Sequence, residues 1–333
     1  MIPASLLPDV LLSGLQEPFL GKPAWMWLAF MAAVVALLVL DLGVLHRRPR
    51  AIAVRESLWM SAFYISVALL FGAWVWIELG AEAGEEYLTG FLVEKTLALD
   101  NIFVISLIFA YFAVPPIHQH RVLFWGILGV IVLRAAMIGL GAALVSAFSW
   151  TLYLFALFLV ATGIKMLLMG DAAPDIGANP VLRALRRVLR ITPQPHGSRF
   201  FVRLPHPESG RRVLWVTPLF VALLLIEIVD LVFAVDSVPA IFAITDDPFI
   251  VYTSNIFAIL GLRALYFALA AAVGRFRYLK PALALVLVFI GAKIFVADLA
   301  GWEKFPASLS LGITLGLLSG GVIWSVWRMR QDR

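Results

Sequence analysis

The sequence has no cysteine and few charged residues. Only 14% of its 333 residues are Asp, Glu, Lys or Arg, whereas 62% are hydrophobic. The absence of cysteine excludes disulfides, thiol redox chemistry and thiolate metal sites. Because a soluble domain has about 25% charged and about 45–50% apolar residues, this composition predicts a protein that crosses a membrane several times.

Histidine is also scarce. The five histidines, at positions 46, 118, 120, 196 and 206, lie in loops or at the ends of apolar runs. The apolar runs hold no nucleophile–base pair and the chain has no phosphate-binding glycine loop, so the sequence indicates neither an enzyme nor a bound cofactor. The first 24 residues lack the basic region and short apolar core of a cleavable signal peptide, and we expect none.

Nine apolar runs are long enough, at about 20 residues each, to span a bilayer. They cover residues 25–45, 57–79, 88–114, 121–146, 148–169, 213–243, 249–273, 281–299 and 306–327. Nineteen Lys or Arg residues lie on one side of these runs and only Lys22 and Lys304 on the other. Since basic loops stay in the cytoplasm, we expect the N-terminus outside and the C-terminus inside a bacterial cytoplasmic membrane. The net charge of +5 then reflects cytoplasmic loops, and no nucleic-acid partner is expected.

The longest segment between runs, residues 170–212, is rich in arginine. Its first part, VLRALRRVLR, is typical of a short amphipathic helix on the inner membrane surface, in contact with lipid. A solvated linker is the simpler alternative, and a small membrane or cytoplasmic partner could also bind here. The segment divides a single transmembrane domain into peripheral spans 25–79, a three-helix unit 88–169, a second unit 213–299 and a last span 306–327.

The two three-helix units resemble each other. LALDN, beginning at Leu97, matches FAVDS at Phe233; LGVIVLRA matches FAILGLRA; and ATGIKML matches FIGAKIF. A unit with an odd number of spans enters the membrane from opposite sides in its two copies. The sequence therefore predicts an inverted repeat, which many secondary transporters share, with binding near the midplane where the halves meet.

The apolar residues 224–241 include Glu227, Asp230 and Asp236 and no basic residue. An ionised group at the centre of a membrane helix costs roughly 2.5–3.5 kcal/mol, so these acids require a bound cation, protons or a basic residue from another span. At 100° per residue, Glu227 and Asp230 share a face. Pro239 predicts a kink or an unwound turn that re-aims Asp236 inward.

Carboxylate and amide oxygens, without cysteine or inward histidine, suit Mg²⁺, Ca²⁺ or Mn²⁺ better than Zn²⁺ or Cu⁺. Desolvated carboxylates can also exchange protons against a metal. The candidate metal ligands are Glu94, Asp100, Asn101, Glu227, Asp230, Asp236 and Asn255.

A second set of charged residues is expected to couple protons or to act as counter-charges. Buried salt bridges are the simpler interpretation of its basic members, and Lys165 and Lys293 lie near enough to span ends to reach the interface. Asp41 either balances nearby arginines at a helix end or is a ligand on an access path. The set comprises Asp41, Lys95, Arg134, Arg263 and Lys293.

Four stretches, LDLGVLHRR, EEYLTGFLVEKTLALDNIFV, EIVDLVFAVDSVPAIFAIT and TSNIFAILGLRALYF, resemble the TerC/Alx family of integral membrane proteins over essentially the whole chain. The resemblance implies the fold of LysE-type exporters, two inverted three-helix bundles. It also implies Mn²⁺ export, with links to tellurium resistance and to the alkaline-pH response. The family's acidic motifs fall on the seven candidate ligands. Leu97 and Ala98 stand where a serine is expected, which removes a possible hydroxyl ligand.

These observations predict a secondary transporter that exports a divalent metal, Mn²⁺, by proton antiport. One alternative keeps transport but changes the cargo to another small cation or an amino acid, with Arg263 holding a carboxylate. The other is a membrane scaffold in tellurite or stress resistance, whose acids form structural ion pairs only. Neutralising an acid together with its basic partner would restore function in a scaffold but not in a transporter.

Overall fold

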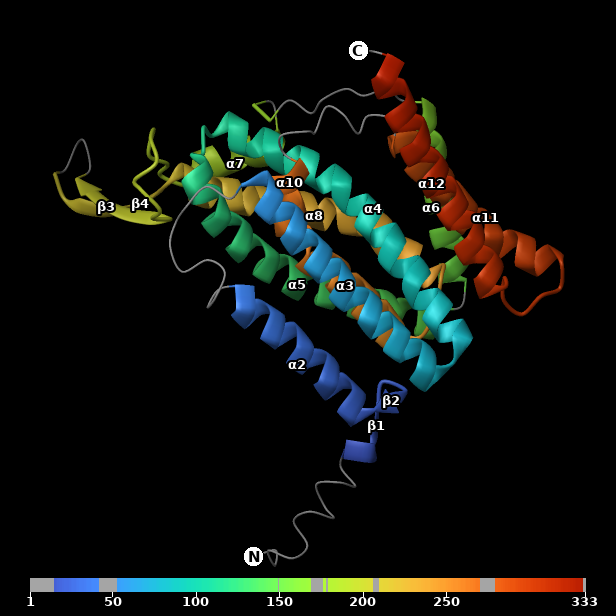
Figure 1. The fold of residues 1–333 in the computed structure, drawn as a ribbon. Coiled ribbons are helices and arrows are strands. Elements are labelled where there is room, and N and C mark those ends of the chain that lie inside the picture. The colour runs from blue at the N-terminus through green and yellow to red at the C-terminus, as the bar shows by residue number, and fades with distance from the viewer. Residues whose placement is uncertain are drawn as a thin grey trace, which may run out of the picture.

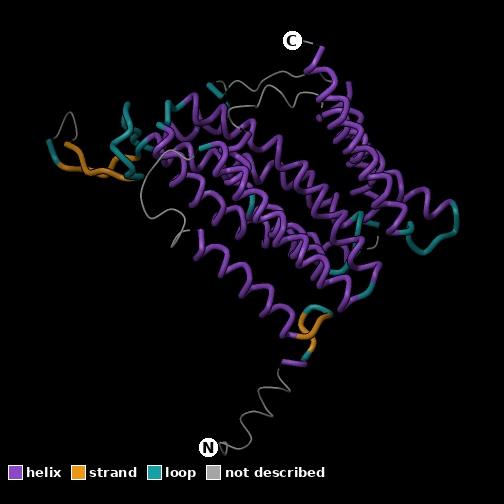
Figure 2. The backbone as a smooth tube through the Cα atoms, in the orientation of Figure 1, coloured by secondary structure: helices purple, strands orange, loops and turns teal. Residues whose placement is uncertain are grey.

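The structure is a computed structural model that describes residues 15–41, 53–148, 150–168, 176–177, 179–205, 210–269 and 279–331. Helices make up most of this part of the chain, as Figure 2 shows. The helices are α2 (Ala24–Leu40), α3 (Val54–Leu79), α4 (Ala81–Tyr111), α5 (Pro116–Ala147), α6 (Thr151–Leu168), α7 (Pro180–Val188), α8 (Pro218–Phe242), α9 (Pro248–Leu260), α10 (Leu262–Leu269), α11 (Leu279–Leu299) and α12 (Ala307–Gln331). Two antiparallel hairpins complete it: β1 (Pro18–Phe19) with β2 (Lys22–Pro23), and β3 (Phe201–Pro205) with β4 (Arg212–Val216).

Seven helical stretches of the described residues are long and apolar enough to cross a membrane: α3, α5, α6, α8, α9 with α10, α11 and α12. Helix α2 is apolar but has only 17 residues, whereas α4 has 31 residues and carries Glu94, Lys95 and Asp100 close together. These nine stretches lie on the nine predicted runs, although residues 213–216, which were expected to begin a span, form β4. Residues 42–45, 149, 169 and 270–273 of the runs lie outside the described part. The prediction of an all-α, multi-pass membrane protein is confirmed; length and hydropathy by themselves assign seven spans.

The helices of the two units pack reciprocally. Helix α4 packs on α9 and α5 packs on α8, so the first helix of each unit contacts the second helix of the other. The third helices, α6 and α11, pack on each other, and Figure 1 shows them with α12 at one side of the bundle. Helix α2 packs on α9 and α3 on α4 and α10. Reciprocal contacts of this kind are what two inverted repeats produce.

The close packing of α6 on α11 depends on two glycines at equivalent positions of the repeat. A Cβ atom at Gly163 would lie 2.7 Å from the carbonyl oxygen of Ala284, and one at Gly291 would lie 2.5 Å from that of Ala156. Small residues let membrane helices approach until their backbones touch. The sequence ALFLVATGIK in α6 answers ALVLVFIGAK in α11, so the same device occurs once on each helix.

The helix break expected at Pro239 is absent. Helix α8 continues from Pro218 to Phe242 with Pro239 inside it, so no unwound turn re-aims Asp236. The break lies instead at Gly261, between α9 and α10. There the ammonium group of Lys95 donates to the carbonyl oxygen of Ala258 at 3.0 Å, and a Cβ atom at position 261 would lie 2.7 Å from that ammonium nitrogen. The side chain of Lys95 therefore replaces a helical hydrogen bond, and glycine makes room for it.

The arginine-rich segment 170–212 is folded over much of its described length. The side chain of Asn179 accepts a hydrogen bond from the amide of Val181 and caps α7, which confirms a short basic helix. The second part forms the hairpin β3–β4, not a linker; the alternation in FVRLP and RVLWV is the local signal for it. Arg121 of α5 donates to Ser198 and lies over the ring of Phe200, which ties this segment to the helical bundle.

A contact at the opposite end of the bundle gives a prediction about pH. Lys304 donates to Asp246 at 2.6 Å, and this hydrogen bond lowers the pKa of Asp246. A carboxyl group whose pKa falls on folding stabilises the folded state above its unfolded-state pKa, and this stabilisation is lost as the pH falls through the folded-state pKa. The side chains are 55% and 59% exposed, so the contact contributes at most about 1 kcal/mol.

We therefore expect Asp246→Asn to lower the stability of the protein slightly at pH 7, and the difference from wild type to vanish well below about pH 4. Thermal unfolding in detergent as a function of pH measures both. A difference that grows on acidification would contradict the assignment.

Candidate cation site

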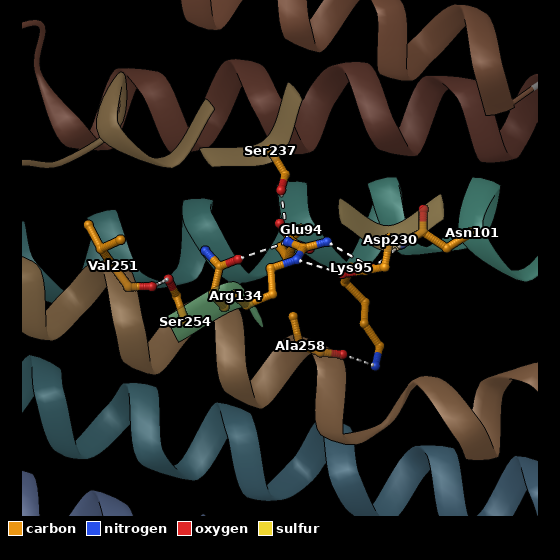
Figure 3. Close-up of polar contacts among 10 residues, drawn as sticks. Glu94, Lys95, Asn101, Arg134, Asp230, Ser237, Val251, Ser254 and Ala258 are labelled. Carbon is orange, nitrogen blue, oxygen red and sulfur yellow. Dashed lines mark hydrogen bonds and ion pairs between the residues drawn. The ribbon is translucent and has the colours of Figure 1, made fainter. Parts of the chain in front are cut away.

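A buried arginine lies between two carboxylates at the centre of the bundle. Arg134 of α5 donates from Nη1 to Glu94 of α4 at 2.5 Å and from Nε to Asp230 of α8 at 3.2 Å. Its Nη2 also donates to Asp230, at 3.3 Å. Figure 3 shows the guanidinium between the two acids. The three residues are 1%, 3% and 5% exposed. Two carboxylates share one guanidinium, so the ionised cluster has an excess of one negative charge.

Neutral oxygens complete the surroundings of Arg134. Ser237 and Asn255 accept from Nη1 at 2.7 and 3.2 Å, and Asn101 donates to Asp230 at 3.1 Å. Nη1 carries two hydrogens but faces three acceptors, counting Glu94, so these bonds must be shared. The Nδ2 of Asn255 is buried without a hydrogen-bond partner among the described residues. The cluster is thus rich in oxygen ligands, the kind that hard cations prefer.

The cluster follows the internal repeat. When LALDN is aligned with FAVDS, Glu94 corresponds to Asp230 and Asn101 corresponds to Ser237. Glu94 and Asp230 both bind Arg134. Each acid also forms a hydrogen bond across to the other unit: Glu94 with Ser237, and Asp230 with Asn101. Arg134 is therefore shared by equivalent acids of the two units, close to the place where the units meet.

The structure places two other candidate ligands away from Arg134. The carboxylate of Glu227 lies against Gly129 of α5, where a Cβ atom would collide with it, and its Oε2 is buried without a hydrogen-bond partner in the described part of the chain. Asp236 accepts from the hydroxyl of Thr162 at 3.5 Å, on the α6 side of α8. The side chain of Asp100 lies outside the described residues.

The remaining charged candidates are distributed over the bundle. Arg263 of α10 forms an ion pair with Asp41 at the end of α2, so the two equivalent arginines, Arg134 and Arg263, have different partners. Lys95 donates to the backbone carbonyl oxygen of Ala258, as Figure 3 shows. Lys293 is only 5% exposed and donates to Ser310 of α12 at 3.1 Å, so its ammonium group lies inside the bundle.

Among the described side chains, no three His, Asp or Glu residues lie close enough together to hold a metal ion. The arrangement brings together Glu94, Asp230, Asn101 and Asn255 and puts Arg134, itself a fixed cation, between the acids. Such a cluster can accept an exchangeable cation or a proton when the guanidinium withdraws from one carboxylate. Ser237 and Thr162 were not among the site residues predicted from the sequence. The alignment of Asp100-Asn101 with Asp236-Ser237 could have indicated Ser237, because Asn101 was already a candidate.

Apolar helices that pack around a buried charged cluster define a multi-pass helical membrane protein. More closely, the chain belongs to the integral membrane protein TerC family, whose family model matches residues 79–333. It is 49% identical over 302 residues to an uncharacterized membrane protein of Rickettsia bellii, covering 91% of this chain and 97% of the relative. It is 43% identical over 320 residues to the "Putative membrane-bound redox modulator Alx" of Salmonella typhi, covering 93% and 96%. No solved structure matches the chain significantly.

Proposed function

We propose that this protein is a secondary transporter of the bacterial cytoplasmic membrane that exports Mn²⁺ in exchange for protons. The observation that carries the proposal is the buried cluster in which Glu94 and Asp230 share Arg134. An excess of negative charge inside a membrane bundle is costly unless a cation or a proton binds there. The resemblance to the TerC/Alx family supports Mn²⁺ as the cargo.

Arg134 has a defined part in this proposal. In the absence of cargo it binds both acids and compensates one of their two negative charges. When Mn²⁺ or protons bind, its bond to at least one of the acids breaks. Protons and metal compete for the same carboxylate oxygens, because a protonated carboxyl group is a poor metal ligand. This competition provides the exchange of protons for metal.

The structure bears on two alternatives. An amino-acid cargo needs a basic residue to hold its carboxylate, and Arg263, the residue expected for this, is paired with Asp41. A redox role, suggested by the printed name of the Salmonella relative, has no thiol to use in this chain, which lacks cysteine. A divalent cation suits the acid-rich cluster better than either.

The test is Mn²⁺ uptake into proteoliposomes under an imposed pH gradient. We expect gradient-dependent uptake by wild type and a loss of at least tenfold in Asp230→Asn, because Arg134 would then neutralise Glu94 completely and the excess negative charge would be gone. Glu78→Gln, which changes an exposed carboxylate at the end of α3, is the matched control and is expected to transport as wild type does. Normal uptake by a folded Asp230→Asn protein would reject the site, and no uptake by wild type would reject transport of Mn²⁺.

A further inference from the structure

Two cavities lie in the groove between the helix pairs α4–α8 and α6–α11. The first, of about 290 Å³, is lined by residues that include Arg134, Asn101, Asp236 and Lys165. The second, of about 380 Å³, is lined by residues that include Glu86, Thr245, Lys293 and Ser310. Helix α8 begins directly after strand β4 of the hairpin. Residues within 233–237 line the first cavity and residues 242–246 line the second, so the first cavity lies nearer the hairpin. We call them the hairpin-side cavity and the far cavity.

The two cavities follow one another along the same four helices. Each of the four helices contributes one residue to each cavity at the point where the two are nearest. For the hairpin-side cavity, these residues are Leu97 on α4, Thr162 on α6, Ser237 on α8 and Leu287 on α11. For the far cavity, they are Thr89, Tyr153, Phe242 and Lys293 on the same helices. At 1.5 Å per residue, the separation along α4 is about 12 Å and along α11 about 9 Å. The cavities are therefore two ends of one groove, interrupted by about 10 Å of protein.

Apolar side chains fill this interval. They belong to one buried hydrophobic cluster, and each of the four helices contributes one of them. On its helix, each lies between the residue that lines the hairpin-side cavity and the residue that lines the far cavity. The constriction comprises Val93 (2% exposed), Leu159 (0%), Ile241 (3%) and Ile290 (0%). It lies where Gly291 of α11 comes into contact with the backbone of α6 at Ala156. A dry apolar interval of this length blocks a hydrated ion.

Each cavity has polar groups that suit a cation. The hairpin-side cavity reaches Arg134 and Asn101 of the buried cluster, and Asp236 lies on its wall beside Thr162. In the far cavity, the carboxylate of Glu86 accepts a hydrogen bond of 2.5 Å from Thr245. Lys165 and Lys293, equivalent in the repeat, line one cavity each. An inverted repeat places such equivalent residues at opposite ends of the bundle.

A competing path is much narrower. A third cavity beside Asp230, lined by Arg263 and residues of α5 and α10, has a volume of about 20 Å³. A single water molecule needs about 10–15 Å³ by such a measure, so this space admits hardly more than one. The volumes favour the groove between α4–α8 and α6–α11.

We propose that this groove is the path of the transported cation and that Val93, Leu159, Ile241 and Ile290 form its gate. The inference rests on the proposed function. In the conformation seen here, the buried cluster communicates with the hairpin-side cavity and is closed to the far cavity. Export requires α6 and α11, joined through their glycines, to shift against α4 and α8 so that the constriction moves to the hairpin side of the cluster.

The absence of native cysteine makes single-cysteine variants direct reporters of water access. Leu287→Cys reports on the hairpin-side cavity and Ile294→Cys on the far cavity. The control is Leu157→Cys on α6, whose side chain is 60% exposed on the surface of the bundle and is expected to face lipid. A charged, membrane-impermeant methanethiosulfonate reagent is applied to either side of sealed vesicles without Mn²⁺.

We expect Leu287→Cys to react from the side of the arginine-rich segment and Ile294→Cys from the opposite side, each at least tenfold faster than Leu157→Cys. Reaction of both at the rate of Leu157→Cys would overturn the path even if wild type transports Mn²⁺. The expected labelling without Mn²⁺ uptake by wild type would instead overturn the proposed function and leave the water-filled groove in place.

The gate is tested separately by Leu159→Ala combined with Ile290→Ala, which widens the constriction. We expect downhill leakage of Mn²⁺ without a pH gradient to rise at least tenfold over wild type. Leakage at the wild-type level from the folded double variant would overturn the assignment of these residues as the gate.

Discussion

Arg134→Gln is expected to abolish Mn²⁺ transport and to destabilise the protein strongly. The substitution leaves Glu94 and Asp230 buried, close together and without their cation. Removing one partner of a buried ion pair costs about 3–5 kcal/mol, because the other charge remains desolvated. Thermal unfolding of the purified protein in detergent measures the loss of stability, and uptake into proteoliposomes measures transport.

A triple variant separates the structural part of this effect from the part in transport. When Glu94→Gln and Asp230→Asn are added to Arg134→Gln, no buried charge remains in the cluster, and most of the lost stability is expected to return. Transport is expected to stay absent, since no carboxylate is left to bind a cation. Recovery of full function in the triple variant would show that the cluster is a structural ion pair, as the scaffold alternative predicts.

Gly291→Ala is expected to have the second largest effect, on both stability and transport. The new Cβ atom would lie 2.5 Å from the carbonyl oxygen of Ala156, so α6 and α11 must separate along their contact. Overpacking of this kind costs about 1–3 kcal/mol. Gly163→Ala, with its Cβ atom 2.7 Å from the carbonyl oxygen of Ala284, is expected to act similarly.

The two glycine variants test the pairing of the third helices because they alter one interface. Their effects on the unfolding temperature in detergent are expected to be non-additive in the double variant, since one separation of the helices relieves both collisions. Gly316→Ala in α12 is the control: nothing lies within 4 Å of its Cβ position, and alanine favours the helix by about 1 kcal/mol. Gly291→Ala protein as stable as wild type would contradict the close approach of α6 and α11.

Much of the architecture could be read from local patterns. Hydropathy located every long helix of the described residues, because a membrane helix must be apolar over about 20 residues wherever it packs. The repeated LALDN and FAVDS motifs indicated two related units, and the rarity of charge inside the spans marked Glu94 and Asp230 as candidates for function.

Local patterns were less reliable where the outcome depends on neighbouring helices. Pro239 indicated an interrupted α8, but this helix is continuous. The interruption falls at Gly261, because Lys95 of another helix takes the carbonyl of Ala258. The hairpin β3–β4 was not predicted, although its strands alternate, because they are short and rich in arginine.

By itself, the sequence determined that this is a multi-pass helical membrane protein of two similar units, whose buried acids require a bound cation, a proton or a basic partner. Only the tertiary structure decided that Arg134 binds those acids whereas its equivalent, Arg263, pairs with Asp41. The two arginines stand in equivalent LRA motifs, so periodicity and hydropathy do not distinguish them. Their partners come from other helices, and the packing of those helices decides which charges meet.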